Sequence, residues 1–563
     1  MTDNLSHVKG ALTPPLYEET IGAALKQAAI QWPEQEALVS VHQKIRWSFA
    51  ELERRAAEFA CGLLSLGVER GDRVGIWAPN CAEWAVVQFA TAKAGMILVN
   101  INPAYRTSEL EYTLNKVDVK ALVLAERFRG SDYPAILETL APEISKSKPG
   151  ALDAAKLPQL KAAIMIGDVP RAGYLRFRDV AAMGRPKHFN QLREIERDVS
   201  SHDPINIQFT SGTTGLPKGA TLSHRNILNN GFFVGRSIAL EEGDRVCIPV
   251  PLYHCFGMVM GNLACVVHGA TMIYPADGFD PLAVLHAVQA ESCTALYGVP
   301  TMFISLLEHP EFERFDLSSL RTGIMAGAPC PIEVMRRVID RMHMKDVTIA
   351  YGMTETSPVS FQSSPEDPIE RRVSTVGRVQ PHLEVKIVDS EGKTTPIGEP
   401  GELCTRGYSV MLCYCDDDEK TAQAVDKDGW MHTGDLATLD AEGYGNIVGR
   451  IKDMVIRGGE NIYPREVEEF LFHHPKVEDV QVVGVPDAKF GEELCAWIKL
   501  KAGEQANEEE IKAFCRDQIA HYKVPRYVRF VDAFPMTVTG KIQKYLIREQ
   551  MIKELGLAIQ KTA

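Results

Sequence analysis

The 563-residue sequence lacks the features of several protein classes, and each absence narrows what the chain can be. Its 12 cysteines include no CxxC pair, which disfavours a disulfide framework and fits a reducing compartment. Cys413 and Cys415 form a C-x-C without a second pair nearby, so no zinc site is expected there. A net charge of −13 lacks the basic surplus of nucleic-acid-binding proteins, so no nucleic-acid partner is expected.

The N-terminal region lacks a basic segment followed by an apolar run, and the first arginine is Arg46. These absences favour a cytoplasmic location over secretion or organelle import. Residues 246–276 contain no Asp, Glu, Lys or Arg, which raises the question of a membrane span. Prolines, glycines and histidines interrupt this stretch, which predicts a strand, a loop and a helix of about a dozen residues. We therefore expect no transmembrane segment.

Short apolar strands alternate with helical segments along most of the chain. Residues 73–77 are predicted to form a strand, 81–94 a helix that Gly95 ends, and 97–100 the next strand. The alternation returns further along the chain, with predicted strands at 246–248, 271–274 and 294–297. It predicts an α/β fold with several layers and largely parallel sheets.

The chain is too long for one hydrophobic core, so at least two domains are expected. Near Gly449 the polar turns give way to a compact segment with candidate strands at 480–485 and 495–500 and a candidate helix at 507–521. This composition predicts a separate, small α+β domain at the C-terminal end.

Residues 210–219 combine four hydroxyl side chains, three glycines and a lysine, directly after a predicted strand at 205–209. Glycines let backbone N–H groups turn toward an anion, while hydroxyls and lysine add donors and positive charge, so the loop favours polyphosphate. A flexible surface turn is the alternative. The loop is not a Walker A motif, because Leu216 and Pro217 separate the second glycine from the lysine. The candidate nucleotide-binding residues are Thr210, Ser211, Gly212, Thr213, Thr214, Gly215, Leu216, Pro217 and Lys218.

This loop resembles the phosphate loop of the adenylate-forming superfamily, which includes the acyl-CoA synthetases. A second segment, residues 351–356, follows a predicted strand at 347–350 and also resembles that family. The resemblance implies that Tyr351 stacks on adenine, Thr354 contacts the α-phosphate and Glu355 holds magnesium. A strand-terminal turn with an ordinary exposed glutamate is the alternative.

Residues 430–435 and 449–453 resemble the family's ribose and hinge motifs. A carboxylate can accept both ribose hydroxyl protons and a guanidinium can donate to the same sugar, so Asp435 and Arg450 are implied to hold the ribose. A plain hairpin turn at Gly434 and Asp435 is the alternative. Lys452 corresponds to the hinge about which the small C-terminal domain turns between two half-reactions.

Residues 535–541 end in Gly540 and Lys541 and resemble the family's terminal catalytic motif, although an isolated surface lysine is the alternative. The implied catalytic residues are Lys541, Thr354, Glu355 and Lys218. Three further assignments follow from the resemblance. They are an adenine-side loop of Gly327, Ala328 and Pro329, an acyl pocket with His254, Phe256, Gly298 and Val299, and a coenzyme A path at Gly458 and Gly459.

The resemblance extends from about residue 20 to 550 and is strongest to fatty-acyl-CoA synthetases of the medium-chain and mitochondrial family-member-two type. It implies a large multi-sheet α/β domain (residues 1–449), a hinge (450–453) and a small mobile α+β domain (454–563). The expected activity joins a medium- to long-chain fatty acid to coenzyme A with ATP and Mg²⁺. A free-standing acyl-AMP ligase and a carrier-loading adenylation enzyme are the alternatives. The oligomeric state is left open, with a homodimer as one candidate.

One departure from the family pattern lies ahead of the ribose motif. Family members commonly carry a glycine after the Val-Met pair, whereas this chain continues Val410, Met411, Leu412 and Cys413. If that glycine has a positive φ, Cys413 is expected to be strained or the turn to differ.

Overall fold

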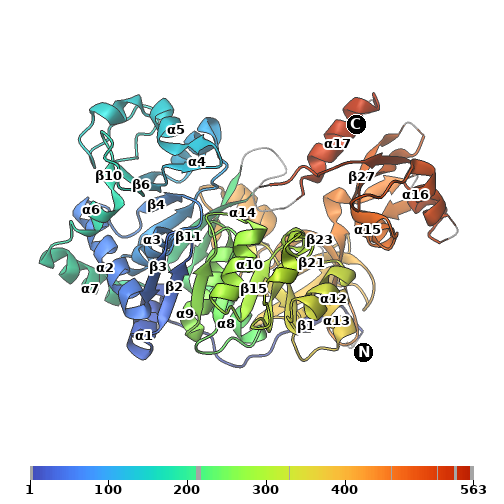
Figure 1. Cartoon of the computed structure of the whole chain (residues 1–563), viewed down its shortest axis with the longest axis horizontal. Coiled ribbons are helices and arrows are strands. Elements are labelled where there is room, and N and C mark those ends of the chain that lie inside the picture. Colours follow the sequence, from blue (N-terminus) through green and yellow to red (C-terminus); the bar gives the residue numbers. More distant parts are fainter. Residues whose placement is uncertain are drawn as a thin grey trace.

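The computed structural model describes residues 4–210, 217–328, 330–457, 460–487, 489–516, 518–537 and 542–557, without the side chains of Lys452, Glu460 and Asn461. A large α/β domain carries a smaller α+β domain at its C-terminal end, drawn in orange to red in Figure 1. The fold class is therefore the one that the sequence predicted.

An eight-stranded sheet forms one layer of the large domain. Pairing is parallel across its first six strands and antiparallel at the last two. The strands are, in sheet order, β10 (Leu175–Arg176), β9 (Ala162–Met165), β6 (Val119–Leu124), β4 (Arg73–Trp77), β5 (Ile97–Asn100), β11 (Pro204–Thr210), β12 (Lys218–Ser223) and β22 (Cys413–Tyr414).

A nine-stranded sheet forms the second layer, and its six central strands are parallel. The strands are, in sheet order, β19 (Arg378–Val379), β18 (Val359–Gln362), β17 (Asp346–Gly352), β16 (Thr322–Ala326), β15 (Ala295–Gly298), β13 (Arg245–Cys247), β14 (Thr271–Tyr274), β2 (Glu36–Ser40) and β3 (Ile45–Ser48). A small hairpin joins β7 (Arg127–Phe128) to β8 (Ser131–Asp132).

A third, wholly antiparallel sheet of five strands was not predicted. Its strands are β1 (His7–Lys9), β20 (Leu383–Val388), β21 (Gly401–Gly407), β23 (Met431–Leu439) and β24 (Gly445–Arg450). β20 and β21 follow each other along the chain, as do β23 and β24, and between β21 and β23 the chain leaves this sheet to add β22 to the eight-stranded one. β24 ends at Arg450, so the first residue of the predicted hinge lies within this sheet.

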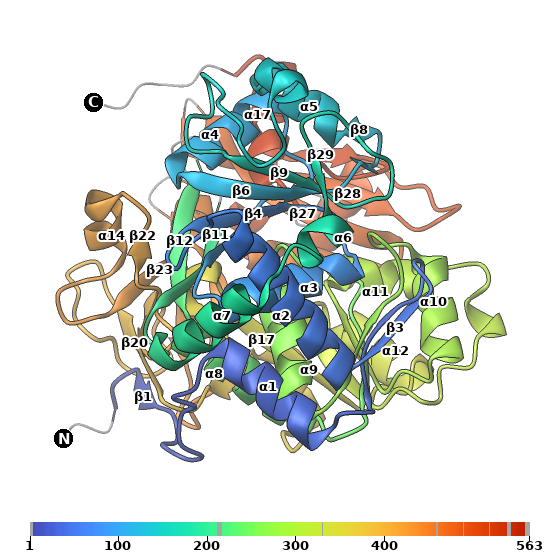
Figure 2. The ribbon, with the colours of Figure 1, turned by 90° about the vertical axis from the view of Figure 1, so that its left-hand side faces the viewer.

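Helices cover the two parallel sheets. Helices α1, α2, α3 and α7 pack against one another beside β4 and β5 (Figure 2). The Ser48 hydroxyl caps α2 by accepting the Glu51 N–H at 3.2 Å. The helices are α1 (Ile21–Gln31), α2 (Phe49–Ser65), α3 (Ala82–Lys93), α4 (Thr107–Lys116), α5 (Tyr133–Leu140), α6 (Phe177–Ala181), α7 (Pro186–Asp198), α8 (His224–Ser237), α9 (Ala264–His268), α10 (Pro281–Ala290), α11 (Pro300–Leu307), α12 (Ile332–Arg341), α13 (Ile369–Ser374) and α14 (Asp418–Ala424).

The uncharged stretch 246–276 forms β13, a π-helix η2 (Phe256–Leu263), α9 and β14. The predicted helix therefore exists, but its first eight residues have π rather than α geometry. Such π segments often occur at functional sites. In the part of the chain that the structure describes, no helix is both long and apolar enough to cross a membrane.

The small domain has its own sheet, in the order β26 (Glu460–Ile462), β25 (Val455–Arg457), β28 (Gly491–Leu500) and β27 (Val477–Asp487), with β29 (Tyr527–Phe530) beside β28. Its helices are α15 (Pro464–Phe472), α16 (Glu508–Cys515) and α17 (Lys544–Glu554). The predicted helix 507–521 is too long, because Arg516 takes up an extended conformation that ends α16. Ile519 still packs on the domain core, so burial of the apolar residues does not require a longer helix.

Candidate active site

The glycine-rich loop joins two strands of one hairpin. Thr210 ends β11, Lys218 begins β12, and the two residues face each other in the antiparallel register. The Tyr112 hydroxyl donates to the Pro217 carbonyl oxygen at 3.0 Å, which holds the far end of the loop to α4. Ser211, Gly212, Thr213, Thr214, Gly215 and Leu216 lie outside the described residues.

Glu355 lies at the centre of a polar cluster beside this hairpin. It belongs to the short 3-10 helix η4 (Thr354–Thr356), directly after Thr354, and only 5% of it is exposed. Its Oε1 accepts hydrogen bonds from the Thr210 hydroxyl at 3.0 Å and the Tyr414 hydroxyl at 2.8 Å. Lys218 Nζ lies 4.3 Å above the Tyr414 ring and donates to its hydroxyl at 3.4 Å. The structure thus brings Thr210, Lys218 and Glu355 together around Tyr414.

Tyr414 is a member of this cluster that the sequence did not reveal. Burial, followed by the Glu355 carboxylate, raises the pKa of Tyr414 well above its usual value of 10.0. The phenol therefore stays protonated and donates to Glu355. Tyr414 is 59 positions away from Glu355 and reaches it because β22 adds to the edge of the sheet beside β12.

Of the two outcomes expected at Cys413, strain or a different turn, the structure shows no left-handed strain. Cys413 lies in β22 opposite Thr221 of β12, and it is absent from the residues with positive φ. The left-handed conformation belongs to Asp416, three residues later, with φ 49°. Cys413 is therefore an ordinary β-strand residue.

Asp435 holds a second cluster together. Arg450 faces it across β23 and β24, with Nε 3.1 Å from Asp435 Oδ1. The Tyr351 hydroxyl donates to the other carboxylate oxygen, Oδ2, at 2.6 Å. Burial, and then the Asp435 charge, raises the pKa of Tyr351 well above 10.0, so this phenol also remains a donor. The residues expected at adenine and ribose therefore form one connected group.

The turn that carries Asp435 is fixed by its own backbone and by β21. Gly434 has φ 71°, a left-handed conformation that favours glycine. Its N–H donates to Glu402 Oε1 at 3.1 Å. The Thr433 hydroxyl donates to the Leu403 carbonyl oxygen at 2.7 Å and accepts the Asp435 N–H at 3.1 Å. These bonds set the position of the Asp435 carboxylate.

The expected acyl and adenine segments are neighbours. Gly327 has φ 86°, and a Cβ there would lie 3.3 Å from Val299 Cγ1, at the start of α11. Ala328 follows Gly327, whereas Pro329 lies outside the described residues. A Cβ on Gly298, the last residue of β15, would meet the Phe303 ring at 3.0 Å.

The other two acyl-pocket candidates lie at the start of the π-helix. The Phe256 ring stacks on Tyr297, the residue before Gly298, with ring centroids 5.8 Å apart. The His254 ring lies 4.2 Å from the Tyr253 ring. A small cavity beside this segment is lined in part by Pro251, Tyr253 and Met302.

The predicted hinge, coenzyme A path and catalytic lysine are less fully described. Lys452 belongs to the 3-10 helix η5 (Ile451–Asp453), and its side chain is not described. Gly458, Gly459 and Lys541 lie outside the described residues.

The base of the loop that carries Lys541 is nevertheless defined. Met536 and Ile542 form an antiparallel bridge, and the Gln543 N–H donates to the Pro535 carbonyl oxygen at 2.8 Å. Lys544 Nζ then lies 2.5 Å from Glu468 Oε1. These contacts hold the described residues before position 538 and after position 541 to the small domain.

Comparisons with known proteins identify two matching family domains. The AMP-binding enzyme family matches residues 25–415, and the AMP-binding enzyme C-terminal domain matches residues 466–541. A Bacillus subtilis (strain 168) protein described as "Putative acyl-CoA synthetase YngI" is 51% identical over 96% of this chain and 99% of its own length. The Homo sapiens medium-chain acyl-CoA ligase ACSF2, mitochondrial, is 48% identical over 98% of this chain and 91% of its own.

Similarity extends to solved structures. The anthranilate CoA ligase AuaEII in complex with anthranoyl-AMP superposes with a TM-score of 0.85 at 27% identity, covering 96% of this chain and 99% of that one. Both family domains match in order along the chain, and the superposition includes the large and the small domain. The chain belongs to the AMP-binding enzyme family.

Proposed function

We propose that this chain is an ATP-dependent acyl-CoA synthetase that activates a carboxylic acid as an acyl-adenylate and transfers the acyl group to coenzyme A. The observation that carries the proposal is the placement of two clusters on one segment. Tyr351 contacts Asp435, while Glu355, four residues later, contacts the base of the glycine-rich hairpin. A nucleotide with its nucleoside on the first cluster and its phosphates on the second fits this arrangement.

In the first half-reaction the acid's carboxylate oxygen attacks the α-phosphorus of ATP, the bond to the β-phosphate breaks, and pyrophosphate leaves. Both reactants are anionic, so positioning and charge stabilisation dominate the barrier. We assign Lys218 and the glycine-rich loop to the β- and γ-phosphates, Thr354 to the α-phosphate, and Lys541 to the acyl carboxylate and the α-phosphate.

The donor set around Glu355 fits Mg²⁺. A buried carboxylate beside hydroxyl oxygens is a hard-oxygen environment, and Mg²⁺ commonly binds through one or two carboxylates together with substrate phosphates. Bound Mg²⁺ would neutralise phosphate charge. We therefore assign Glu355 as its protein ligand.

In the second half-reaction the thiol sulfur of coenzyme A attacks the acyl carbonyl carbon, the acyl–phosphate bond breaks, and AMP leaves. The thiol gives up its proton in the process. Lys541 and the thiol would need the same face of the adenylate, so we assign the exchange to rotation of the small domain (454–563) against the large one (1–449) at residues 450–453. Gly458 and Gly459 would line the coenzyme A path, because glycine leaves room for a narrow ligand.

We further propose a medium- to long-chain fatty acid as the substrate. Support comes from the apolar surroundings of Phe256 and Val299 and from the relative named as a medium-chain ligase. Short and aromatic acids are the competing classes, and AuaEII is named for an aromatic one. The cytoplasmic location stays a prediction, since the ACSF2 relatives are named as mitochondrial.

The test of the proposed function is ATP–pyrophosphate exchange across a homologous series of carboxylic acids, followed by thioester formation with and without coenzyme A. Acid-dependent exchange and coenzyme A-dependent thioester would support the synthetase. Exchange without thioester would indicate an acyl-AMP ligase. Absence of exchange with every acid would contradict adenylate formation.

Replacing Glu355 with glutamine is expected to weaken the magnesium dependence of adenylation. The amide keeps the shape and one acceptor oxygen but loses the negative charge, so the Mg²⁺ concentration at half-maximal rate should rise about tenfold or more. Pyrophosphate exchange measured against total Mg²⁺ gives this value. Tyr414→Phe is the matched control, because it removes the hydroxyl next to Glu355 and leaves the carboxylate in place. A normal Mg²⁺ titration for Glu355→Gln would contradict the assignment.

A further inference from the structure

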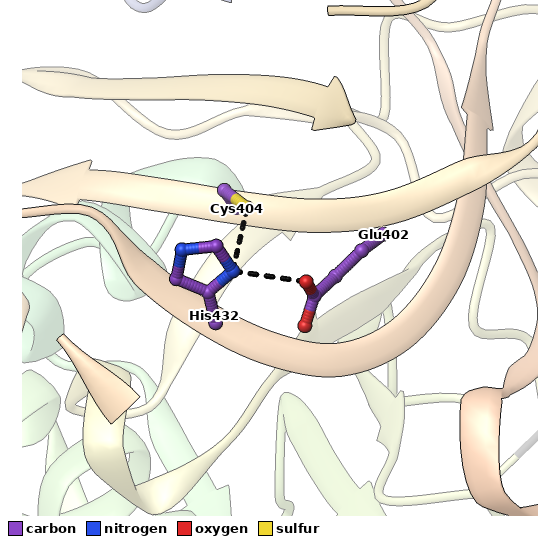
Figure 3. Close-up of side chains that lie close together, drawn as sticks. All are labelled: Glu402, Cys404 and His432. Carbon is purple, nitrogen blue, oxygen red and sulfur yellow. Dashed lines mark hydrogen bonds and ion pairs between the residues drawn. The ribbon is translucent and has the colours of Figure 1, made fainter. Parts of the chain in front are cut away.

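A separate group of three side chains lies between β21 and β23, beside the turn that carries Asp435. His432 Nδ1 is 2.9 Å from Glu402 Oε2 and 3.5 Å from Cys404 Sγ (Figure 3). Their ligand atoms all lie within 4.8 Å of one another. Within the residues that the structure describes, this is the one such group of three or more His, Cys, Asp or Glu side chains.

The strand pairing explains why these side chains meet. Glu402 and Cys404 are two positions apart on β21 and so project from the same face. Cys404 stands opposite His432 in the antiparallel register with β23. Side chains on directly opposed positions of paired strands lie close together, so strand pairing brings Cys404 to His432, whereas Glu402 reaches His432 across a register shift in the β21–β23 pairing.

We propose that Glu402, Cys404 and His432 form a binding site for Zn²⁺. Thiolate, imidazole and carboxylate together are the donor set of zinc, whereas Mg²⁺ prefers oxygen ligands alone. Ligands that bind zinc at about 2.0 to 2.3 Å in a tetrahedron are about 3.3 to 3.8 Å apart. The Cys404–His432 separation of 3.5 Å lies within that range, and the Glu402–His432 separation of 2.9 Å needs only a few tenths of an ångström more.

Two of the three proposed ligands are partly exposed, which gives a metal ion access from solvent and leaves room for a fourth ligand. The side chains of His432 and Glu402 are 33% and 23% exposed, whereas Cys404 is buried. A cation can therefore reach Glu402 and His432 from solvent and contact the buried Cys404 thiol beside them. A water molecule would complete the tetrahedron on the solvent side, as in zinc sites with three protein ligands.

The surroundings of the three ligands also suit a metal. Zinc at Nδ1 requires the imidazole proton on Nε2, and Nε2 faces Asp426 Oδ2 at 3.8 Å. Asp426 is held in place by the N–H groups of Asp428 and Trp430, both at 2.9 Å from Oδ1. A carboxylate behind a metal-bound imidazole is a common supporting contact. Binding would release the Cys404 thiol proton to solvent, and metal ligation would replace the hydrogen bond between His432 Nδ1 and Glu402 Oε2 while the imidazole keeps its proton on Nε2.

The site would couple the metal to the nucleotide turn. Glu402 uses Oε2 toward His432 and Oε1 to accept the Gly434 N–H, one residue before Asp435. A metal on Oε2 leaves the Oε1 contact intact and fixes the carboxylate that holds the turn. Zn²⁺ binding should therefore raise the unfolding temperature of the protein, since a ligand that binds only the folded state stabilises it.

The experiment is a titration of the full chain with Co²⁺ alone, with Zn²⁺ added afterwards as competitor. Co²⁺ bound to a thiolate gives an intense charge-transfer absorption in the near ultraviolet, a readout that does not depend on activity. One equivalent of Co²⁺ is expected to bind with this absorption, and Zn²⁺ should abolish it. Cys404→Ala should lose the absorption while its own unfolding transition shows that it is folded.

The matched control is the double variant Cys413→Ser, Cys415→Ser, which removes the two cysteines that are partly exposed. It should bind Co²⁺ as the unaltered protein does. If Cys404→Ala fails to fold, Cys404→Ser provides the same comparison. Absorption that survives loss of the Cys404 thiol, or that disappears only in the double variant, would overturn the proposal. So would the absence of thiolate absorption at saturating Co²⁺.

Discussion

Lys541→Ala is expected to nearly abolish acyl-AMP formation from acid and ATP while leaving thioester formation from pre-made acyl-AMP and coenzyme A close to the unaltered rate. The ammonium group would stabilise charge between the acyl carboxylate and the α-phosphate, and that need ends once the adenylate exists. Removing one such preorganised group typically costs about 10² to 10³ in rate. Pyrophosphate exchange measures the first half-reaction, and thioester release from acyl-AMP measures the second.

Two further variants make this result specific. Lys553→Ala removes an exposed lysine at the end of α17 in the same domain and should change neither half-reaction. Lys452→Pro should show the opposite asymmetry to Lys541→Ala, because proline fixes φ near −65° at the proposed hinge and should slow thioester formation more than adenylation. Equal losses in both half-reactions for both Lys541→Ala and Lys452→Pro would contradict these roles and indicate general damage to the fold.

The parallel part of the fold could be predicted because its signals are local. β4, β5 and β14 coincide with the predicted strands, and α3 begins and ends within one residue of its prediction. Each is a short apolar run with glycine, proline or polar residues at its ends. Burial on both faces makes such runs almost continuously apolar, so they stand out against the surrounding sequence.

The antiparallel sheet and the end of α16 were missed because they depend on contacts between segments that are distant in the sequence. β20, β21, β23 and β24 belong to a sheet in which polar and apolar residues alternate, and their pairing depends on contacts between strands rather than on composition. In α16 the apolar spacing continues past Cys515, but the chain satisfies it without a helix because Ile519 packs on the same core. The spacing of apolar residues alone therefore cannot show whether the segment after Cys515 is helical.

In the candidate site, too, residues in local motifs could be predicted, whereas contacts between residues distant in sequence could not. Thr210, Lys218, Glu355 and Asp435 were each found from a motif of neighbouring residues. Tyr414, the partner of Glu355, was not, because it reaches Glu355 across 59 positions through an edge strand. The Glu402, Cys404 and His432 group likewise exists only through cross-strand pairing, and no spacing of metal ligands in the sequence indicates it.

Asp435→Ala is expected to weaken the binding of both ATP and AMP, and hence to slow both half-reactions. The ribose would lose its acceptor, while the Arg450 guanidinium and the Tyr351 hydroxyl would lose the carboxylate that they contact now. Loss of charged hydrogen bonds of this kind costs about 1.5 to 3 kcal/mol, or about 10- to 150-fold in affinity. Calorimetric titration with AMP measures the change without requiring catalysis.

Tyr351→Phe separates the carboxylate's own role from the positioning that Tyr351 provides. It keeps the aromatic ring for adenine and removes only the hydroxyl that donates to Asp435, so the loss in AMP affinity should be about 1 kcal/mol. Because Asp435 is nearly buried, the thermal unfolding of each variant must be measured together with its affinity for AMP, to show that the variant is folded. A folded Asp435→Ala protein with unchanged AMP affinity would remove Asp435 from the nucleotide site. A loss for Tyr351→Phe as large as that for Asp435→Ala would instead show that the phenol, rather than the carboxylate, carries the ribose contact.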